Sequence, residues 1–317
     1  MISIGQDIEI NPNIELLTPQ VHENMAIIPL KTEPSYIDLL TLKKGLQLGL
    51  VKVSECDHSV VNTLVVKNRA VTPLILIDGD EVVGGDQNRI VNATILIEAK
   101  SEMKVPVNCT EHGRWGYKHE FKHSNYMANY RTRSSKEVAS RNNMSDQQAV
   151  WDSIECLEVE RSFSSPTQAM SESYDNAKLD LDEALTHFNI EDKQNGVVII
   201  VDGEIKGFEI FLNSPIYKEY HEKILKSYLI DININDSVFT INTDEAKSLV
   251  SDALDSEFNA GKSNGMEEVL EFENSEGLGK IYTYQDEMIH MSYFKNASEK
   301  IAINDKNGEG ADERIIF

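Results

Sequence analysis

The stretch PLILIDGDEVVGGDQNR at residues 73–89 carries the strongest local signals in the chain. Its aliphatic start at 74–77 is typical of a buried strand, and the Asp78-Gly79 pair that follows favours the tight turn of a β-hairpin. Gly84-Gly85 then stands between a group of carboxylates and the polar triplet 87–89. This order of features predicts short antiparallel strands joined by turns, with a polar loop at the glycine pair.

We call residues 79–89 motif 1, and its glycine pair has two interpretations. Glycines contribute almost no packing, so Gly84 and Gly85 indicate either a hairpin turn with a bulge or a close backbone approach to a ligand. In the second case their N–H groups could hold an oxyanion. The loop is neither a P-loop nor a dinucleotide fingerprint, because no G-K-[ST] follows it and no G-x-G-x-x-G opens a helix.

Motif 2, with the sequence CTEHGRW at residues 109–115, combines acid, base, thiol, guanidinium and indole groups just after a predicted strand. Cys109 is more typical of a buried strand residue than of a nucleophile. A structural alternative also stays open, in which Glu111 and Arg114, or Asp80 and Arg89, form ion pairs and Trp115 fills the core.

Both flanks of motif 1 are rich in strand signals. Thr41 can cap a short helix at 42–48 that Gly49 ends. The polar and basic stretch 117–143 has no apolar period, so we expect a long loop there. Short runs of β-branched and aliphatic residues predict strands at 25–30, 50–53, 63–66, 74–77, 90–97 and 105–109.

Helix and strand signals alternate in the second half of the chain. A capping box made by Ser145 and Gln148 starts one amphipathic helix, and another follows Pro166. The Asp202-Gly203 turn predicts a hairpin over 197–212. Further helices are expected after the caps Ser214 and Thr243, and further strands near 268–272, 280–284 and 288–294.

Strands followed by helices and then strands predict an α+β fold and not a doubly wound sheet. We expect an antiparallel β-rich N-terminal half with packing helices, followed by a mixed helix/strand C-terminal half. The β-rich region spans residues 1–133 and carries both motifs, and a helical and α+β region at 134–303 packs on it. No linker separates the two, so two domains or one continuous domain both fit the length. A loose tail is expected at 304–317.

Composition limits the function classes. The apolar fraction of 40% and the charged fraction of 26% are typical of folded soluble chains. A formal charge of −23 disfavours bulk binding to nucleic acid or to an anionic membrane. The sequence lacks a signal-peptide pattern and a run of ~20 apolar residues, and its three cysteines form no C-x-x-C pair. These features predict a cytoplasmic protein with neither a disulfide framework nor a structural zinc site.

Positive charge gathers locally around motif 2. A run of this kind is usually a solvated loop, but a site for a phosphate or carboxylate group is the alternative. The window 104–133 holds the basic residues Lys104, Arg114, Lys118, Lys122, Arg131 and Arg133, the acids Glu111 and Glu120, and the histidines His112, His119 and His123. These histidines lack the spacing of a metal motif, so no metal site is expected.

The combined spacing of several segments resembles the ADP-ribosylglycohydrolase and rhodanese-phosphatase associated protein family. The resemblance covers most of residues 40–229 and implies a role in metabolism or repair that involves ADP-ribose, NAD-derived or RNA-linked phosphate groups. It implies no particular reaction or cofactor, and the cofactor stays unassigned. The segments are LxLxxGxxxGL at 40–50, VxxLxVxNR at 61–69, motif 1 with its preceding strand, VPVNCTEHGRW at 105–115, QAVW at 148–151, GFEIF at 207–211 and KILKSY at 223–228.

Three hypotheses follow from the resemblance and the motifs. In the first, an enzyme acts on a small phosphorylated nucleotide-like ligand in a cleft between the motifs, with Glu81 or Glu111 as the general acid/base. Arg89 and Arg114 would clamp its phosphates. In the second, a noncatalytic module binds such a ligand or a partner enzyme of the same pathway. In the third, the motifs only lock a corner of the sheet. The other expected ligand-binding residues are Gly84, Gly85, Gln87, Asn88, His112 and Trp115.

Overall fold

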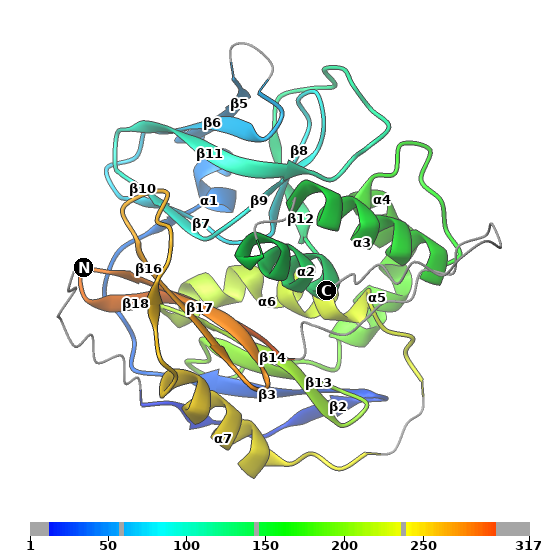
Figure 1. Ribbon diagram of the computed structural model, residues 1–317, viewed down its shortest axis with the longest axis vertical. Coiled ribbons are helices and arrows are strands. Elements are labelled where there is room, and N and C mark those ends of the chain that lie inside the picture. The colour runs from blue at the N-terminus through cyan, green and yellow to red at the C-terminus, as the bar shows by residue number, and fades with distance from the viewer. Residues whose placement is uncertain (1–12, 57–59, 143–145, 236–238, 296–317) are drawn as a thin grey trace.

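A computed structural model describes residues 13–56, 60–142, 146–235 and 239–295 (Figure 1). The expected tail at 304–317 and the capping residue Ser145 lie outside these ranges. Within them the chain forms seven helices and eighteen strands, and every strand pairing is antiparallel except that of β4 (Leu40–Thr41) with β7 (Leu74–Leu76). The α+β prediction is confirmed.

A nine-stranded antiparallel sheet forms the lower part of Figure 1. Its strands follow the order β1-β3-β13-β14-β18-β17-β16-β15, and β2 also pairs with β3. Because β3 comes from the N-terminal part of the chain, the sheet crosses the boundary that the sequence places at residue 133. The strands are β1 (Glu15–Leu16), β2 (Gln20–His22), β3 (Met25–Lys31), β13 (Gly196–Val201), β14 (Glu204–Phe211), β15 (Asn259–Ala260), β16 (Glu268–Asn274), β17 (Gly277–Tyr284) and β18 (Glu287–Lys295).

Both faces of this sheet are covered by helices, which explains why β13 is apolar at almost every position. Successive side chains of a strand point to opposite faces. Ile199 therefore packs into the core that contains α6 (Ser214–Leu229), whereas Ile200 packs into the core that contains α7 (Thr243–Leu254). Figure 1 shows α6 above the sheet and α7 below it. The predicted hairpin at 197–212 is confirmed as β13 and β14.

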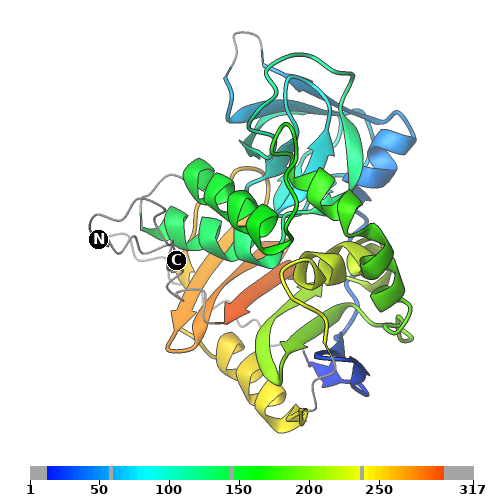
Figure 2. The ribbon, with the colours of Figure 1, turned by 90° about the vertical axis from the view of Figure 1, so that its right-hand side faces the viewer.

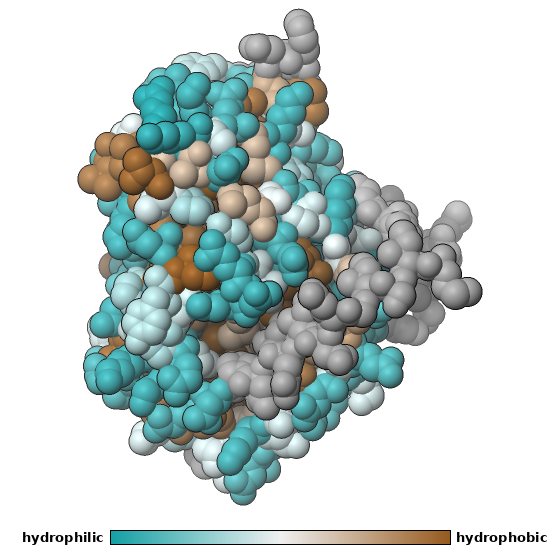
Figure 3. All heavy atoms as spheres, turned by 90° about the vertical axis from the view of Figure 1, so that its left-hand side faces the viewer, coloured by the Kyte–Doolittle hydropathy of each residue, from teal (hydrophilic) through white to brown (hydrophobic). Residues whose placement is uncertain are grey.

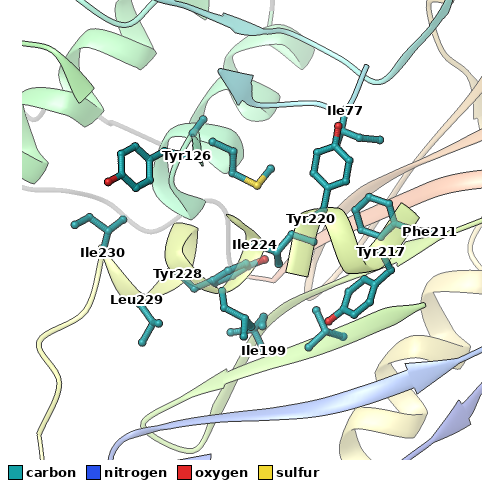
Figure 4. Packing of buried hydrophobic residues seen from close by; sticks show 14 of the residues in the cluster. Ile77, Tyr126, Ile199, Phe211, Tyr217, Tyr220, Ile224, Tyr228, Leu229 and Ile230 are labelled. Carbon is teal, nitrogen blue, oxygen red and sulfur yellow. The ribbon is translucent and has the colours of Figure 1, made fainter. Parts of the chain in front are cut away.

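Helix α6 joins the lower sheet to the upper part of the molecule. The predicted core-facing residues Ile216, Tyr220, Ile224 and Tyr228 are all buried. In Figure 4, Tyr220 points from the helix toward Ile77 in the upper part. Burying a large apolar side chain contributes roughly 1.5–3 kcal/mol, so this helix alone stabilises the contact between the two parts substantially.

Two smaller sheets form the upper part. The tight turn at Asp78-Gly79 forms as expected, with Asp80 N donating to Ile77 O at 3.0 Å and Gly79 at φ +81°. The hairpin expected around this turn is wrong, because β7 and β8 do not pair and the turn instead moves the chain from one sheet to the other. The six-stranded sheet has the order β12-β8-β9-β11-β6-β5 and the three-stranded sheet the order β10-β7-β4. Their remaining strands are β5 (Val51–Glu55), β6 (Thr63–Asn68), β8 (Asp80–Val83), β9 (Arg89–Val91), β10 (Ile95–Ile97), β11 (Glu102–Cys109) and β12 (Lys122–Met127).

Except for the first helix, which packs against the upper sheets, the remaining helices form a layer between the upper sheets and the lower sheet. Figure 2 shows most of this layer in green. Thr41 caps α1 as predicted, by accepting a hydrogen bond from Lys44 N. The helices are α1 (Leu42–Gln47), α2 (Tyr130–Arg141), α3 (Asp146–Glu160), α4 (Met170–Asn176) and α5 (Lys178–Leu185).

Four further local predictions are corrected by the structure. The stretch 117–143 is not one long loop, because it contains β12 and α2. The strand expected at 90–97 is broken into β9 and β10, which lie in different sheets. The helix after Pro166 is interrupted at Ala177, between α4 and α5. The caps of α6 and α7 lie one residue earlier than predicted, at Asn213 and Asn242.

The surface is largely hydrophilic on the face that Figure 3 shows, with hydrophobic side chains in small separate patches. Among the described residues, no helix combines the length and the apolar character that crossing a membrane requires.

Candidate functional site

A cavity of about 350 Å³ lies where the two motifs, β12 and α4 meet. We call it the main cavity, and its volume is in the range of small-ligand sites. Its wall mixes charges of both signs with neutral hydrogen-bonding groups. The basic residues are Lys118, His119, His123 and Lys178, the acids are Glu111, Glu172 and Asp175, and the neutral polar residues are Asn88, Ser124, Asn125 and Ser171.

The glycine pair of motif 1 makes room for the segment before β12. Gly84 has φ +126°, and a Cβ atom there would lie 2.8 Å from Nδ1 of His119 and from O of Glu120. A Cβ on Gly85 would lie 2.3 Å from the Phe121 ring. Both positions therefore require glycine, because a side chain would displace the segment that carries His119 into the cavity wall.

The amides of this loop are already hydrogen bonded. Gly84 N donates to Asn88 Oδ1 at 3.1 Å, and Gly85 N donates to His119 O at 2.8 Å. Asp86 N donates to a carboxylate oxygen of Glu55 at 2.9 Å. These amides therefore favour the interpretation as a turn over that of an oxyanion cradle, because their hydrogens are bonded to the protein's own oxygens.

Arg114 holds motif 1 and motif 2 together. Its guanidinium lies 2.6 Å from the Glu111 carboxylate and donates to the carbonyl oxygens of Gly84 at 3.2 Å and Gly85 at 2.8 Å. The same group donates to Asn88 Oδ1 at 3.2 Å. The predicted ion pair between Glu111 and Arg114 is confirmed. These contacts occupy the guanidinium internally, so its expected role as a phosphate clamp stays a prediction.

Glu111 lines the main cavity as a firmly held carboxylate. Burial raises the pKa of Glu111, but Arg114 and the hydroxyl of Thr167, which donates at 3.0 Å, outweigh it and lower the pKa. Glu111 also forms an isolated β-bridge with Ala169, which fixes the chain entering α4 against motif 2. Motif 2 thus positions the α4 side of the cavity.

Glu81 lies beneath the cavity, not in its wall. It is fully buried, and burial raises its pKa to about 7 although the nearby hydroxyl groups of Ser124 and Thr110 lower it. Thr110 donates to Oε1 at 3.0 Å, whereas Oε2 has no partner among the described residues. Ser124 is in the cavity wall, so it connects Glu81 to the cavity. A catalytic role for Glu81 stays a prediction.

Arg89 and Gln87 are buried away from the cavity. Arg89 donates to Gln87 Oε1 at 3.3 Å and lies 4.0 Å from Glu55, so the alternative pair of Arg89 with Asp80 is wrong. Arg89 is also the strand partner of Cys109, and burial raises the pKa of that thiol. The two motifs meet at Asn88 and Glu111, but Arg89 and Gln87 point elsewhere.

The aromatic end of motif 2 also lies outside the main cavity. Trp115 is 65% exposed, so its interpretation as a core residue is wrong. His112 lines a second cavity of about 280 Å³, where its ring lies 4.4 Å from the ring of Trp151 and its Nδ1 lies 2.9 Å from Gln168 Oε1. The structure therefore does not bring His112 and Trp115, two of the predicted ligand-binding residues, together with Asn88 and Glu111.

A buried charged group supports the wall at His123. Lys223 on α6 forms an ion pair with Asp80, and its Nζ lies 2.9 Å from Nε2 of His123. Tyr220 donates to Asp80 at 2.9 Å. Burial alone raises the pKa of Asp80, but the adjacent Lys223 ammonium group outweighs it and brings the pKa well below its usual range. Asp80 is therefore a permanent anion that fixes the cation behind the wall.

Sequence reasoning missed the contribution of α4 and α6 to the site. Ser171, Glu172, Asp175 and Lys178 are far from both motifs in sequence, and nothing local marks them. His119 and His123 did carry a signal, because they lie in the basic window around motif 2. No group of three or more His, Cys, Asp or Glu side chains in the described ranges is arranged to hold a metal ion.

Comparisons with known proteins give one finding. The family model of the ARG and Rhodanese-Phosphatase-superfamily-associated Protein domain matches residues 13–294. Comparisons with curated proteins and with solved structures found no match. The matched range includes both motifs, α4, α6 and nearly all of the lower sheet.

Proposed function

Because the chain belongs to the ARG and Rhodanese-Phosphatase-superfamily-associated Protein family, we propose that the main cavity binds a small phosphorylated nucleotide-like ligand of the ADP-ribose class. The family's name associates it with ARG, the ADP-ribosylglycohydrolases. The match confirms the resemblance to this family that the sequence motifs predicted. The observation that carries the proposal is the mixed wall of the cavity, with cations and carboxylates facing one space.

The cations of the wall suit phosphate groups. Lys118 and Lys178 are exposed at the cavity from two different elements, the segment before β12 and the start of α5. Ammonium groups bind phosphate oxygens through charge-assisted hydrogen bonds. These lysines replace Arg89 and Arg114 in the proposal, because the two arginines are engaged by Gln87 and Glu111.

The carboxylates of the wall suit ribose hydroxyl groups. Glu111, Glu172 and Asp175 can accept hydrogen bonds from hydroxyl donors, which a phosphate cannot supply when it is fully ionised. A ligand with both phosphate and sugar groups therefore satisfies both sets of wall residues. A site for a phosphate alone would not need the carboxylates, and a site for a sugar alone would not need the cations.

We include hydrolysis of the ligand in this proposal, with Glu81 as a proton-holding group behind Ser124. A carboxyl with a pKa near 7 exchanges protons readily at neutral pH. A cytoplasmic location belongs to the same proposal, and the three unpaired cysteines agree with a reducing compartment. The alternative is a noncatalytic module that presents the ligand to a partner enzyme, which the association in the family's name favours.

Isothermal titration calorimetry with ADP-ribose tests the binding proposal. We expect wild-type protein to bind ADP-ribose more tightly than adenosine, and Lys118→Ala/Lys178→Ala to lose roughly 10-fold to 100-fold in affinity. Lys247→Ala is the matched control, because Lys247 is an exposed lysine on α7 below the lower sheet. Equal affinity for adenosine and ADP-ribose, or equal affinity of the double variant and the wild type, would refute the proposal.

The same samples separate an enzyme from a binding module. Incubation of wild-type protein with ADP-ribose, followed by chromatography of the nucleotide products, shows whether the ligand is consumed. Binding with consumption supports the hydrolytic form of the proposal. Binding without consumption supports the noncatalytic module.

A further inference from the structure

The two histidines of the main cavity, His119 and His123, make hydrogen bonds of opposite direction: a ring nitrogen donates in the first and accepts in the second. Nδ1 of His119 lies 2.7 Å from the carbonyl oxygen of Glu120. A carbonyl oxygen only accepts, so Nδ1 must carry the proton. In a neutral ring this leaves Nε2 of His119 without a proton, and within the described part of the chain Nε2 has no hydrogen-bond partner. His119 is therefore set up as a proton acceptor.

His123 has the reverse arrangement. Its Nε2 lies 2.9 Å from Nζ of Lys223, and an ammonium group only donates. The Asp80 carboxylate, which only accepts, is farther from the same nitrogen, at 3.4 Å. The shorter contact is satisfied when Nε2 of the neutral ring accepts from Lys223 and the ring proton is on Nδ1. Because Nε2 is directed to the buried lysine while the ring lines the cavity, Nδ1 is the nitrogen available to a ligand. His123 is therefore set up as a proton donor.

Lys223 can supply the proton that His123 gives away. Burial lowers the pKa of Lys223, although Asp80 opposes this effect. The side chain cannot turn away, because the Asp80 carboxylate, itself fixed by Tyr220, holds its ammonium group. The contacts from Lys223 through Nε2 to Nδ1 of His123 thus form a short proton path from the core to the cavity.

We propose that His119 and His123 are the general base and general acid of a hydrolysis at phosphorus in the main cavity. This inference rests on the proposed function, and it names the bond that is broken. Nε2 of His119 takes a proton from water as the water oxygen bonds to phosphorus. The bond from phosphorus to the leaving oxygen breaks, and that oxygen takes the proton of His123 Nδ1 while Lys223 passes its proton to Nε2. Exchange with solvent returns a proton to Lys223 and removes one from His119.

Other charged groups face the same space and enter the pH dependence. Asp80 and Lys223 face His123 from β8 and α6. The cavity wall adds Glu111 from motif 2, Glu172 from α4, and Asp175, Lys118 and Lys178. The cations of the wall can neutralise charge that develops on the phosphoryl oxygens, which is the larger part of catalysis in phosphoryl transfer.

The test uses full-length protein with ADP-ribose, which contains a phosphoanhydride, and with 2′,3′-cyclic AMP, which contains a phosphodiester. In ¹⁸O-labelled water, attack at phosphorus places the label on a phosphate product, whereas attack at the glycosidic carbon places it on the sugar. We expect the label on phosphate and a bell-shaped dependence of kcat/KM on pH. Label on the sugar would overturn the inference and leave ligand binding intact.

Variants supply the second readout. His119→Gln and His123→Gln should each lower kcat by at least roughly 100-fold and retain ligand affinity in calorimetry. Lys223→Gln should shift the limb of the kcat/KM–pH profile that belongs to the general acid, His123. A merely structural role of Lys223 would leave this limb where it is. His187→Gln is the control, since His187 stacks on His22 away from the cavity. Thermal denaturation identifies any variant that fails to fold. If one histidine variant does not fold, kcat of the other variant and the position of the ¹⁸O label test the inference.

Two outcomes distinguish this inference from the proposed function. If wild-type protein binds ADP-ribose and converts neither probe between about pH 5 and about pH 9, the histidine pair is refuted and the binding proposal stands. If the protein binds neither probe, both are refuted. Unchanged kcat in His119→Gln and His123→Gln would refute the pair even if the label appears on phosphate.

Discussion

Replacing Glu81 with Gln should change how the free energy of unfolding depends on pH. Glu81 is fully buried, and burial raises its pKa from 4.5 to about 7. Its Oε2 has no partner among the described residues, so the charged form gains little from hydrogen bonds at that oxygen. The folded protein therefore binds this proton more tightly than the unfolded chain does.

The sign and size follow from proton linkage. The stabilisation from protonated Glu81 is fully present below about pH 4.5 and is lost as the pH rises through about 7. A shift of this size corresponds to about 3 kcal/mol, since each pKa unit is worth about 1.4 kcal/mol. Wild-type protein should lose this amount relative to Glu81→Gln between the two pH values, because Gln cannot ionise.

Urea denaturation of both proteins at about pH 5, 6.5 and 8 measures the effect. The difference in the free energy of unfolding should shift by about 2.5 kcal/mol in favour of the variant between these pH limits, because part of the full effect lies below about pH 5. A constant cost of placing an amide at this site cancels, because it is the same at each pH. Differences that stay constant within about 0.5 kcal/mol would refute a raised pKa for Glu81 and its use as a proton-holding group.

Three further substitutions test the internal contacts, each by urea denaturation. Arg114→Ala should cost about 2–4 kcal/mol, because it leaves the buried carboxylate of motif 2 without its cation; a cost below about 0.5 kcal/mol would show that the pair is not stabilising. Arg133→Met should cost about 3–5 kcal/mol, because it leaves the buried Glu209 carboxylate without the guanidinium that lies 2.6 Å from it. Adding Glu209→Leu should recover at least about 1 kcal/mol, since the double variant has no unpaired buried charge. A double variant no more stable than Arg133→Met would contradict this. Gly84→Ala should cost at least about 2 kcal/mol, whereas Gly116→Ala, where a Cβ meets nothing within 4 Å, should cost far less; similar losses would argue against the crowding at His119.

The sequence predicts an element well where its buried face is apolar. The face of α6 could be read from Ile216, Tyr220, Ile224 and Tyr228 because these large residues recur at helical spacing. The hairpin of β13 and β14 followed from its Asp-Gly turn, whose residues Asp202 and Gly203 both have positive φ.

The sequence predicts a loop where α2 forms, and this error has a definite physical cause. The helix buries its polar side chains, because they pair with groups from the upper and lower sheets. Arg133 pairs with Glu209 of β14, and Lys136 pairs with Asp78 next to β8. A helix that is held by charge pairs has no apolar period, so its sequence is typical of a loop.

The site was predictable only in part. The contact between Asn88 of motif 1 and Glu111 of motif 2 confirms that the motifs meet. The direction of each side chain was not predictable: Arg89 follows Asn88 directly in the sequence, yet it contacts Gln87 and Glu55 and does not line the cavity. The α4 side of the wall depends on the bridge between Glu111 and Ala169, which joins segments with no shared local pattern.

The position of β3 has a consequence for how the chain folds as it is made. Ile27 in β3 pairs with Ile199 in β13, so its partner strand is synthesised long after it. Strands β1 and β2 pair with its other edge and are made before it, but the edge that pairs with β13 stays open until then, which exposes an almost wholly apolar strand to pairing with other chains. We expect the lower sheet to assemble late and slowly, since contacts distant in sequence slow folding, and the emerging chain to depend on chaperones until β13 and β14 arrive.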